Sequence, residues 1–287
     1  MEANLKSFMP RLRAMAVAAL LAPVAIVGAQ AQTLNDTVES KGARVAYFNY
    51  APFAYVNDKG DVIGTDVEIL KAVLSKMGLK VSEEVATDWG NLIPGLKAGR
   101  YDVVAAGMFV NPKRCAEVAF SEPTFGIKAT LIVPKGNPKG LKRYEDILSK
   151  GAVLAAVSGT AQVAAALGLG IARENIKEFP DAPTALAALR AGRADAFGVD
   201  APSGRQILAK LPEGDMAMVE PFDDIGGKSA VDHGAFAFRK EDQAFVDRFN
   251  EVMRGFIGTD AYVAINKAHG MTADEAPVKT VSELCGK

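Results

Sequence analysis

The chain has 287 residues, and its 33 basic residues nearly balance 34 acidic ones, for a formal net charge of −1. No basic stretch carries interleaved aromatic residues, so we expect no nucleic-acid partner. Only two histidines occur, His233 and His269, and no set of Cys, His and carboxylate residues has metal-ligand spacing. The sequence therefore predicts no metal site, no cofactor and no serine–histidine hydrolase.

Residues 1–31 have the composition of a secretory signal. Basic residues precede an apolar stretch over residues 14–27, and Ala29 and Ala31 provide small side chains at the positions that a signal peptidase reads. A membrane anchor is the alternative, but the stretch is shorter than the roughly 20 residues that a span needs and contains a proline. We expect cleavage before Gln32 and localisation in the periplasm.

A nine-residue pattern occurs twice. Residues 96–104 read LKAGRYDVV, and residues 189–197 read LRAGRADAF. In each copy the glycine suits the left-handed position after a helix, and a buried strand follows. The alternative is that the pattern is only a common way to end a helix. We interpret it as two similar α/β lobes with a cleft between them, where small molecules often bind.

The elements of the first half alternate between strand and helix. Turn residues, capping residues and apolar periodicity predict strands and helices in chain order: a strand over 44–48, a helix from Thr65 or Asp66 to Gly78, a strand over 79–81, a helix over 91–98 and a strand over 101–106. This alternation is typical of a mostly parallel sheet with helices on both faces.

The second half repeats the alternation after a crossing strand over 131–134 and a turn-rich boundary over 135–140. The expected elements are strands over 153–157, 176–179 and 194–199, helices over 161–167, 183–191 and 203–210, a glycine-rich loop over 224–234, a strand over 235–239 and a helix over 243–257. The sequence thus predicts lobe 1 from residues 32–133 and 225–287 and lobe 2 from residues 134–224.

Cys115 and Cys285 are the only cysteines. An exported protein meets oxidising conditions, and two cysteines allow one bridge. Two free buried thiols are the alternative. We favour the disulfide, which would fasten the C-terminus to the first lobe.

Aromatic residues follow the predicted strands at the edge where a parallel sheet binds ligands. Tyr50 and Phe53 follow the first strand, Trp89 precedes a helix, and Gly107 and Phe109 follow the third strand. Aromatic walls suit a flat or cationic ligand, through stacking or cation–π attraction. Packing of the two phenylalanines in the core is the alternative.

Charged and polar residues occupy matching positions. Arg114 is suited to hold a carboxylate by two hydrogen bonds. Gly159 and Thr160 lead into a helix, whose N–H groups favour an anion. Asp200 follows a second-lobe strand and is placed to meet an ammonium group. A carboxylate holder and an ammonium holder together predict a zwitterion site; a surface pair between Arg114 and Asp200 is the alternative.

With these features the chain resembles the bacterial extracellular solute-binding family 3, the polar amino-acid binders of ABC importers. The resemblance spans essentially the whole mature chain and rests on these segments: Tyr50-Ala51-Pro52-Phe53, Gly64-Thr65-Asp66-Val67-Glu68-Ile69, Leu92-Ile93-Pro94-Gly95-Leu96, Gly107 through Pro112 to Arg114, and Phe120-Ser121-Glu122-Pro123. It implies a two-lobed α/β fold of the periplasmic-binding-protein type II with a central ligand cleft.

Within that family the chain is similar to ectoine/hydroxyectoine-binding proteins. The likeness rests on these segments: Arg114-Cys115, Pro134-Lys135-Gly136-Asn137-Pro138, Tyr144-Glu145-Asp146-Ile147, residues 234–240 and Glu283-Leu284-Cys285. It implies an aromatic box of Phe53, Trp89 and Phe109, with Arg114 on the ligand's carboxylate and a backbone contribution from Gly159.

Four positions depart from the related patterns. Tyr50 stands where ectoine binders place a glutamate, and Asp200 is the residue that general amino-acid binders use for the α-ammonium. Phe109 replaces the small hydroxyl residue of those binders. Tyr47 replaces the acid with which basic-amino-acid binders hold a distal cation, which counts against lysine or arginine. The ligand stays open between an ectoine-like solute and a neutral, cyclic or N-substituted amino acid.

The resemblance implies a monomeric, non-enzymatic protein that captures a small zwitterion by lobe closure and delivers it to an ABC permease in the inner membrane. It also implies that the protein has no catalytic residues. One alternative is a periplasmic dehydratase of prephenate-like acids, in which Asp200 would be the general acid. The other is a sensory partner of a membrane receptor.

Overall fold

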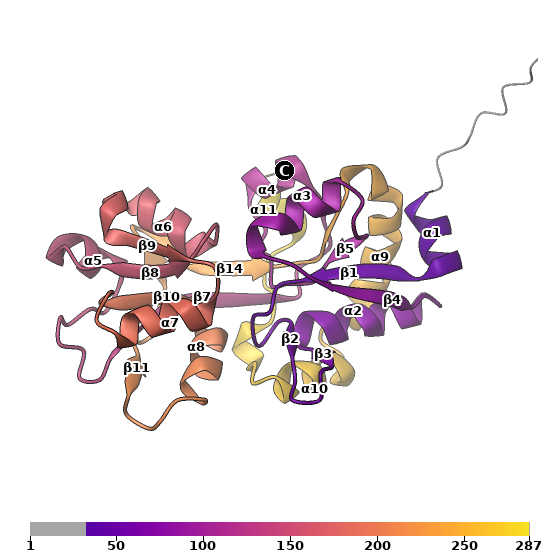
Figure 1. The fold of residues 1–287 in the computed structure, drawn as a ribbon. Helices are drawn as coiled ribbons and strands as arrows, with labels where there is room; N and C mark the ends of the chain where they lie inside the picture. The colour runs from indigo at the N-terminus through magenta and orange to yellow at the C-terminus, as the bar shows by residue number, and fades with distance from the viewer. Residues whose placement is uncertain (1–32, 287) are drawn as a thin grey trace, which may run out of the picture. The chain divides into compact units, whose positions relative to one another are not determined.

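The computed structural model describes residues 33–286, and the predicted signal segment lies outside them. Two main β-sheets, each with its own helices, make up this part of the chain (Figure 1). Among the described residues, no helix has both the length and the apolar character needed to cross a membrane.

The first sheet has the strand order β4-β1-β5-β15-β6, in which β1 runs parallel to β4 and β5, and β15 runs antiparallel to its neighbours. Its strands are β1 Ala43–Tyr47, β4 Val81–Ala86, β5 Val103–Val104, β6 Ala119–Phe120 and β15 Ala237–Phe238. The helices of this region are α1 Leu34–Lys41, α2 Thr65–Lys76, α3 Leu92–Lys97, α4 Pro112–Glu117, α9 Gln243–Phe256, α10 Asp260–Ala268 and α11 Val281–Cys285.

The second sheet has the strand order β11-β7-β10-β8-β9, with β8 parallel to β9 and β10, and β7 antiparallel to β10. Its strands are β7 Phe125–Pro134, β8 Leu154–Val157, β9 Ile176–Phe179, β10 Ala196–Asp200 and β11 Met216–Met218. Its helices are α5 Tyr144–Lys150, α6 Ala161–Leu169, α7 Ala182–Arg190 and α8 Ala201–Leu208. The antiparallel strands in both sheets make the sheets mixed, where the sequence predicted mostly parallel ones.

Short elements complete the chain. They are the hairpin strands β2 Tyr55–Val56 and β3 Val62–Ile63, the hairpin strands β12 Asp224–Ile225 and β13 Lys228–Ser229, the strand β14 Val231–Gly234, and the 3₁₀ turns η1 Trp89–Asn91, η2 Arg173–Asn175, η3 Lys240–Asp242 and η4 Ala273–Glu275.

Two extended strands connect the sheets. β7 leaves the first sheet after β6 and enters the second, and β14 pairs antiparallel with β7 before the chain returns to β15 (Figure 1). The prediction of a loop over residues 224–234 is wrong, because this segment contains a hairpin and β14. Its glycine-rich composition indicates a loop, whereas the partner that makes β14 a strand is distant in sequence.

Helix α2 begins as predicted but is capped differently. The N-cap residue is Gly64, with no side-chain cap, rather than Thr65 or Asp66. The carboxylate of Asp66 instead accepts a hydrogen bond of 2.7 Å from the Gly107 N–H. Asp66, which the sequence predicted as a possible helix cap, therefore fixes the loop that follows β5.

The three largest apolar clusters among the described residues hold the fold together. One lies at the first sheet and another within the second. The third combines Phe48 and Leu92 of the first region with Val157 and Val199 of the second, so the two lobes pack against each other. The predicted disulfide is present and joins Cys115 of α4 to Cys285 of α11.

Candidate ligand-binding site

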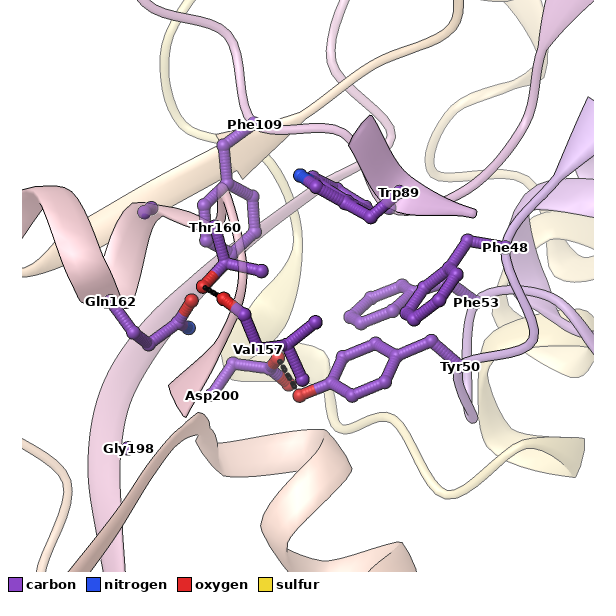
Figure 2. Close-up of a pocket in the computed structure, with 12 residues that line it drawn as sticks. Phe48, Tyr50, Phe53, Trp89, Phe109, Val157, Thr160, Gln162, Gly198 and Asp200 are labelled. Atoms are coloured by element: carbon purple, nitrogen blue, oxygen red, sulfur yellow. Dashed lines mark hydrogen bonds between the residues drawn. The ribbon is translucent and has the colours of Figure 1, made fainter. Parts of the chain in front are cut away.

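A pocket with a cavity volume of about 30 Å³ lies between side chains of the two sheets (Figure 2). The residues that line it are Phe48, Tyr50, Phe53, Trp89, Gly107, Phe109, Val157, Thr160, Ala161, Gln162, Gly198 and Asp200. Most of the residues that the sequence nominated therefore meet in one pocket; Arg114 and Gly159 lie beside it.

Aromatic rings form one wall of the pocket. Figure 2 shows Tyr50, Phe53 and Trp89 on one side, with the Tyr50 and Phe53 rings stacked at 6.1 Å between centroids. Phe53 and Phe109 are 1% and 8% exposed and both pack on Phe125. These two phenylalanines are thus core residues and pocket residues at once, so the two readings of the sequence are not exclusive.

Gly107 is required where β5 leads into the pocket. Its φ is 65°, and a Cβ there would lie 2.7 Å from the ring of Phe53. The N–H of Gly107 donates to Asp66, which is fully buried. Burial raises the pKa of Asp66 to about 6, although the hydrogen bonds from Gly107 and Thr124 act to lower it.

Arg114 lies on the short helix α4, just outside the pocket lining. The Asn111 side chain caps this helix by accepting from the Arg114 N–H at 2.9 Å. The guanidinium Nη1 donates to the Phe109 carbonyl oxygen at 2.8 Å, and its Cζ lies 5.5 Å from the centre of the Trp89 ring. Burial lowers the pKa of Arg114, and Asp232 opposes this shift. Within residues 33–286 the guanidinium has no ion-pair partner within 4.0 Å.

Asp200 lies at the end of β10 and is the N-cap of α8. Its carboxylate accepts from the Ser203 N–H at 2.9 Å and from the Tyr50 hydroxyl at 3.3 Å. Only 2% of Asp200 is exposed, so a surface pair with Arg114 is excluded. Burial raises the pKa of Asp200, whereas the hydrogen bonds from Ser203 and Tyr50 lower it.

The start of α6 provides the rest of the polar wall. Thr160 lines the pocket, and its hydroxyl donates to the Val157 carbonyl oxygen at 2.7 Å. Gly159 lies outside the lining but accepts a hydrogen bond of 3.1 Å from Trp89 Nε1. Trp89 and Tyr50 therefore each reach from the first lobe to the second.

The sequence analysis did not nominate several residues at the site. Gln162 is 8% exposed, lines the pocket and follows Thr160 by two positions, so its place in the first turn of α6 was a usable signal. Phe48 is the last residue of the first predicted strand, so its position at a strand end was a usable signal as well. Asp232 of β14 was missed because its segment was expected to be a loop. Among the described residues, no group of three or more His, Cys, Asp and Glu could hold a metal ion.

Comparisons with known proteins define the class. Residues 44–272 match the bacterial extracellular solute-binding proteins, family 3. A probable amino-acid ABC transporter periplasmic-binding protein of Sinorhizobium fredii is 34% identical over 97% of this chain and 94% of its own length. The crystal structure of EhuB in complex with hydroxyectoine is 31% identical and superposes with a TM-score of 0.78 over 88% of this chain and 97% of that chain.

The chain belongs to the family 3 solute-binding proteins, which are two-lobed, bind small ligands and serve ABC importers together with a membrane permease. This is a family of extracellular or periplasmic proteins. A cyclohexadienyl dehydratase of Pseudomonas aeruginosa is 32% identical over 72% of this chain and 77% of its own length. Since the match to a transport protein covers nearly the whole chain, the protein is a binding protein rather than an enzyme, and the dehydratase is the more distant likeness.

Proposed function

We propose that this protein captures a small zwitterion in the pocket described above and delivers it to the permease of an ABC importer. The observation that carries this proposal is the placement of Arg114 beside the aromatic wall of a pocket that Asp200 also lines. A carboxylate would meet the guanidinium, and the cationic part of the same ligand would meet Asp200. The flat or apolar part would stack on Phe53 and Trp89.

The ligand that fits this arrangement is ectoine, hydroxyectoine or a neutral amino acid, including a cyclic one. The similarity to EhuB favours the first two, and the similarity to the amino-acid binder of Sinorhizobium fredii favours the third. Tyr50 bears on the choice, because its hydroxyl already donates to Asp200. A ligand ammonium would share the carboxylate of Asp200 with that hydroxyl.

Charge argues against the dehydratase alternative. A prephenate-like substrate carries two carboxylates, whereas Arg114 is the one cationic side chain that the described residues place at the pocket, and Asp200 is acidic. A second carboxylate would lie in a site of low polarity without a counter-charge, which is strongly unfavourable. The same site accommodates one carboxylate and one cation without this difficulty.

Lobe closure is the mechanism that we infer. Lobe 1 comprises residues 32–133 and 225–287, and lobe 2 comprises residues 134–224. The ligand would first stack on lobe 1 and bind Arg114, and Thr160 and Asp200 would then add contacts as lobe 2 approaches. These added contacts are the differential affinity that shifts the population to the closed form. We further infer that the signal segment is cleaved before Gln32, that the protein acts as a monomer in the periplasm and that it has no nucleic-acid partner.

Trp89 is the only tryptophan, which gives the test a direct signal. The mature chain, stripped of ligand by unfolding and refolding, is titrated with ectoine and then with each neutral amino acid while tryptophan fluorescence is followed. A saturable micromolar response to ectoine alone identifies a compatible-solute binder. A response to α-amino acids alone assigns the specificity to Tyr50 and Asp200. No response from any zwitterion, with calorimetry equally silent, would contradict the proposed function.

A further inference from the structure

Asp232 is an acidic residue near the pocket that has no role so far. It lies on β14, directly opposite Ile127 in the antiparallel pair with β7. Asp200 lies opposite Ala129 on the other side of the same strand. Because residues 127 and 129 share one face of β7, Asp232 and Asp200 stand on that face, on either side of β7.

This face of β7 is the one that meets the ligand pocket. Ile127 packs in a cluster with Phe53 and Phe109, both of which line the pocket. Asp200 lines it as well. Asp232, in register with Ile127, therefore lies on the face of β7 that meets the pocket, next to residues that line it.

The charges around Asp232 are those of the binding site. Burial raises the pKa of Asp232 to about 6, Arg114 acts to lower it and Asp200 acts to raise it. Within residues 33–286, neither Asp232 nor Arg114 has an ion-pair partner within 4.0 Å. Arg114, Asp200 and Asp232 thus form a group of one basic and two acidic side chains at the pocket.

We propose that Asp232 determines specificity by the net charge of the ligand, so that neutral zwitterions are accepted and ligands of net charge −1 are excluded. The inference rests on the proposed function, because it assumes that a zwitterion occupies the pocket. A bound zwitterion neutralises one positive and one negative charge, which leaves one carboxylate. That carboxylate would repel a second ligand carboxylate, and like charges at such an interface are strongly unfavourable.

Three amino acids of similar size test the proposal at pH 8, where Asp232 is ionised: L-ornithine, L-glutamine and L-glutamate. Affinities are measured by calorimetry, or by displacement of ectoine, for the wild type and for Asp232→Asn, which removes the charge and keeps the shape. The control is Asp223→Asn, an identical change at an exposed position that pairs with Lys128 outside the pocket. Thermal melting confirms that each variant is folded.

Of the three, the wild type should bind glutamate least. In Asp232→Asn glutamate should gain about tenfold in affinity relative to glutamine, a change of roughly 1.4 kcal/mol, whereas ornithine should gain nothing. Asp223→Asn should keep the wild-type order. Equal changes for all three ligands in Asp232→Asn would overturn the proposal. So would a wild type that binds glutamate as tightly as glutamine, a result that stands even if Asp232→Asn does not fold. A wild type that binds no zwitterion contradicts the proposed function instead.

Discussion

The two charged ends of the pocket differ in how completely the protein satisfies them. At one end, Asp200 accepts from the Ser203 N–H and the Tyr50 hydroxyl and caps a helix. At the other end, Arg114 has five N–H donors, and the Phe109 carbonyl is the one hydrogen-bond acceptor that the described residues provide for its side chain. The protein therefore stabilises its carboxylate itself and leaves its guanidinium for the ligand.

This difference indicates where the binding energy arises. A group whose partners are already in place gains less from a ligand than a half-buried group whose donors lack them. Arg114 should therefore dominate affinity, and Asp200 should contribute more to selectivity and to the geometry of the closed form. The four predictions below test this ranking.

Arg114→Ala should have the largest effect on binding. The ligand carboxylate would lose its bidentate partner beside a pocket lined mainly by apolar side chains, and we expect a loss of about 100-fold or more in affinity, corresponding to roughly 3 kcal/mol. Arg114→Lys, which keeps the charge but not the fork geometry, should be intermediate. Tryptophan fluorescence titration measures both, and Arg100→Ala, at an exposed arginine of the same lobe, is the control. Near-normal affinity in Arg114→Ala would remove this residue from the site.

Gly107→Ala should disturb the aromatic wall next to Arg114. The new Cβ would adopt a left-handed conformation and lie 2.7 Å from the Phe53 ring. Gly99→Ala is a matched control, because Gly99 has a φ of 68° but nothing within 4 Å of its would-be Cβ. Both variants should lose about 1–2 kcal/mol of stability from backbone strain. Gly107→Ala should lose about 1–3 kcal/mol more, and only this variant should bind more weakly. Stability is measured by urea unfolding and affinity by fluorescence titration. Equal stability and equal affinity of the two variants would contradict the steric argument.

Asp200→Asn should weaken binding about tenfold, which is less than the loss in Arg114→Ala. The asparagine oxygen can still accept from the Ser203 N–H, and its amide NH₂ can donate to the Tyr50 hydroxyl oxygen, so folding stability should change little while the attraction for a ligand cation is lost. Asp181→Asn is the control, since Asp181 caps α7 in the same way by accepting from the Thr184 N–H. A loss in Asp200→Asn that exceeds the loss in Arg114→Ala would reverse the ranking of the two ends.

Much of the fold follows from local sequence signals. Helix α2, helix α9 and strand β9 were expected within one or two residues, because apolar periodicity and glycine stops are local. The crossing segment was expected only over 131–134, whereas β7 begins at Phe125. Each of β7 and β14 is a strand because it pairs with the other, although the two are about a hundred residues apart in the sequence. That pairing leaves no trace in the composition of either segment.

The site residues show the same division between local signals and long-range contacts. Residues directly after strand ends, such as Tyr50, Gly107 and Asp200, were predictable because strand ends of an α/β sheet converge on the ligand. Asp66 was assigned to a helix cap because the sequence cannot show that its carboxylate turns inward to Gly107. Asp232 was missed for a tertiary reason too, since its position depends on its register with Ile127. Contacts that depend on register or on a buried turn lie beyond a single sequence.

The smallest expected effect concerns Asp66, whose carboxylate accepts a hydrogen bond from the N–H of the pocket residue Gly107. Burial raises the pKa of Asp66 to about 6 in the folded protein, above its ordinary value of 3.8, so the folded state binds its proton more tightly than the unfolded state does. The free energy of unfolding should therefore rise as the pH is lowered from 7 to 5, by about 1 kcal/mol from this residue. Asp232 contributes in the same direction, so Asp66→Asn should reduce the slope without abolishing it. Chemical unfolding of the ligand-free protein at several pH values measures it, with Asp58→Asn at an exposed turn as the control. An unchanged slope in Asp66→Asn would mean that Asp66 remains ionised in the fold, held by Gly107 and Thr124, and that the Arg114 end rests on a buried charge.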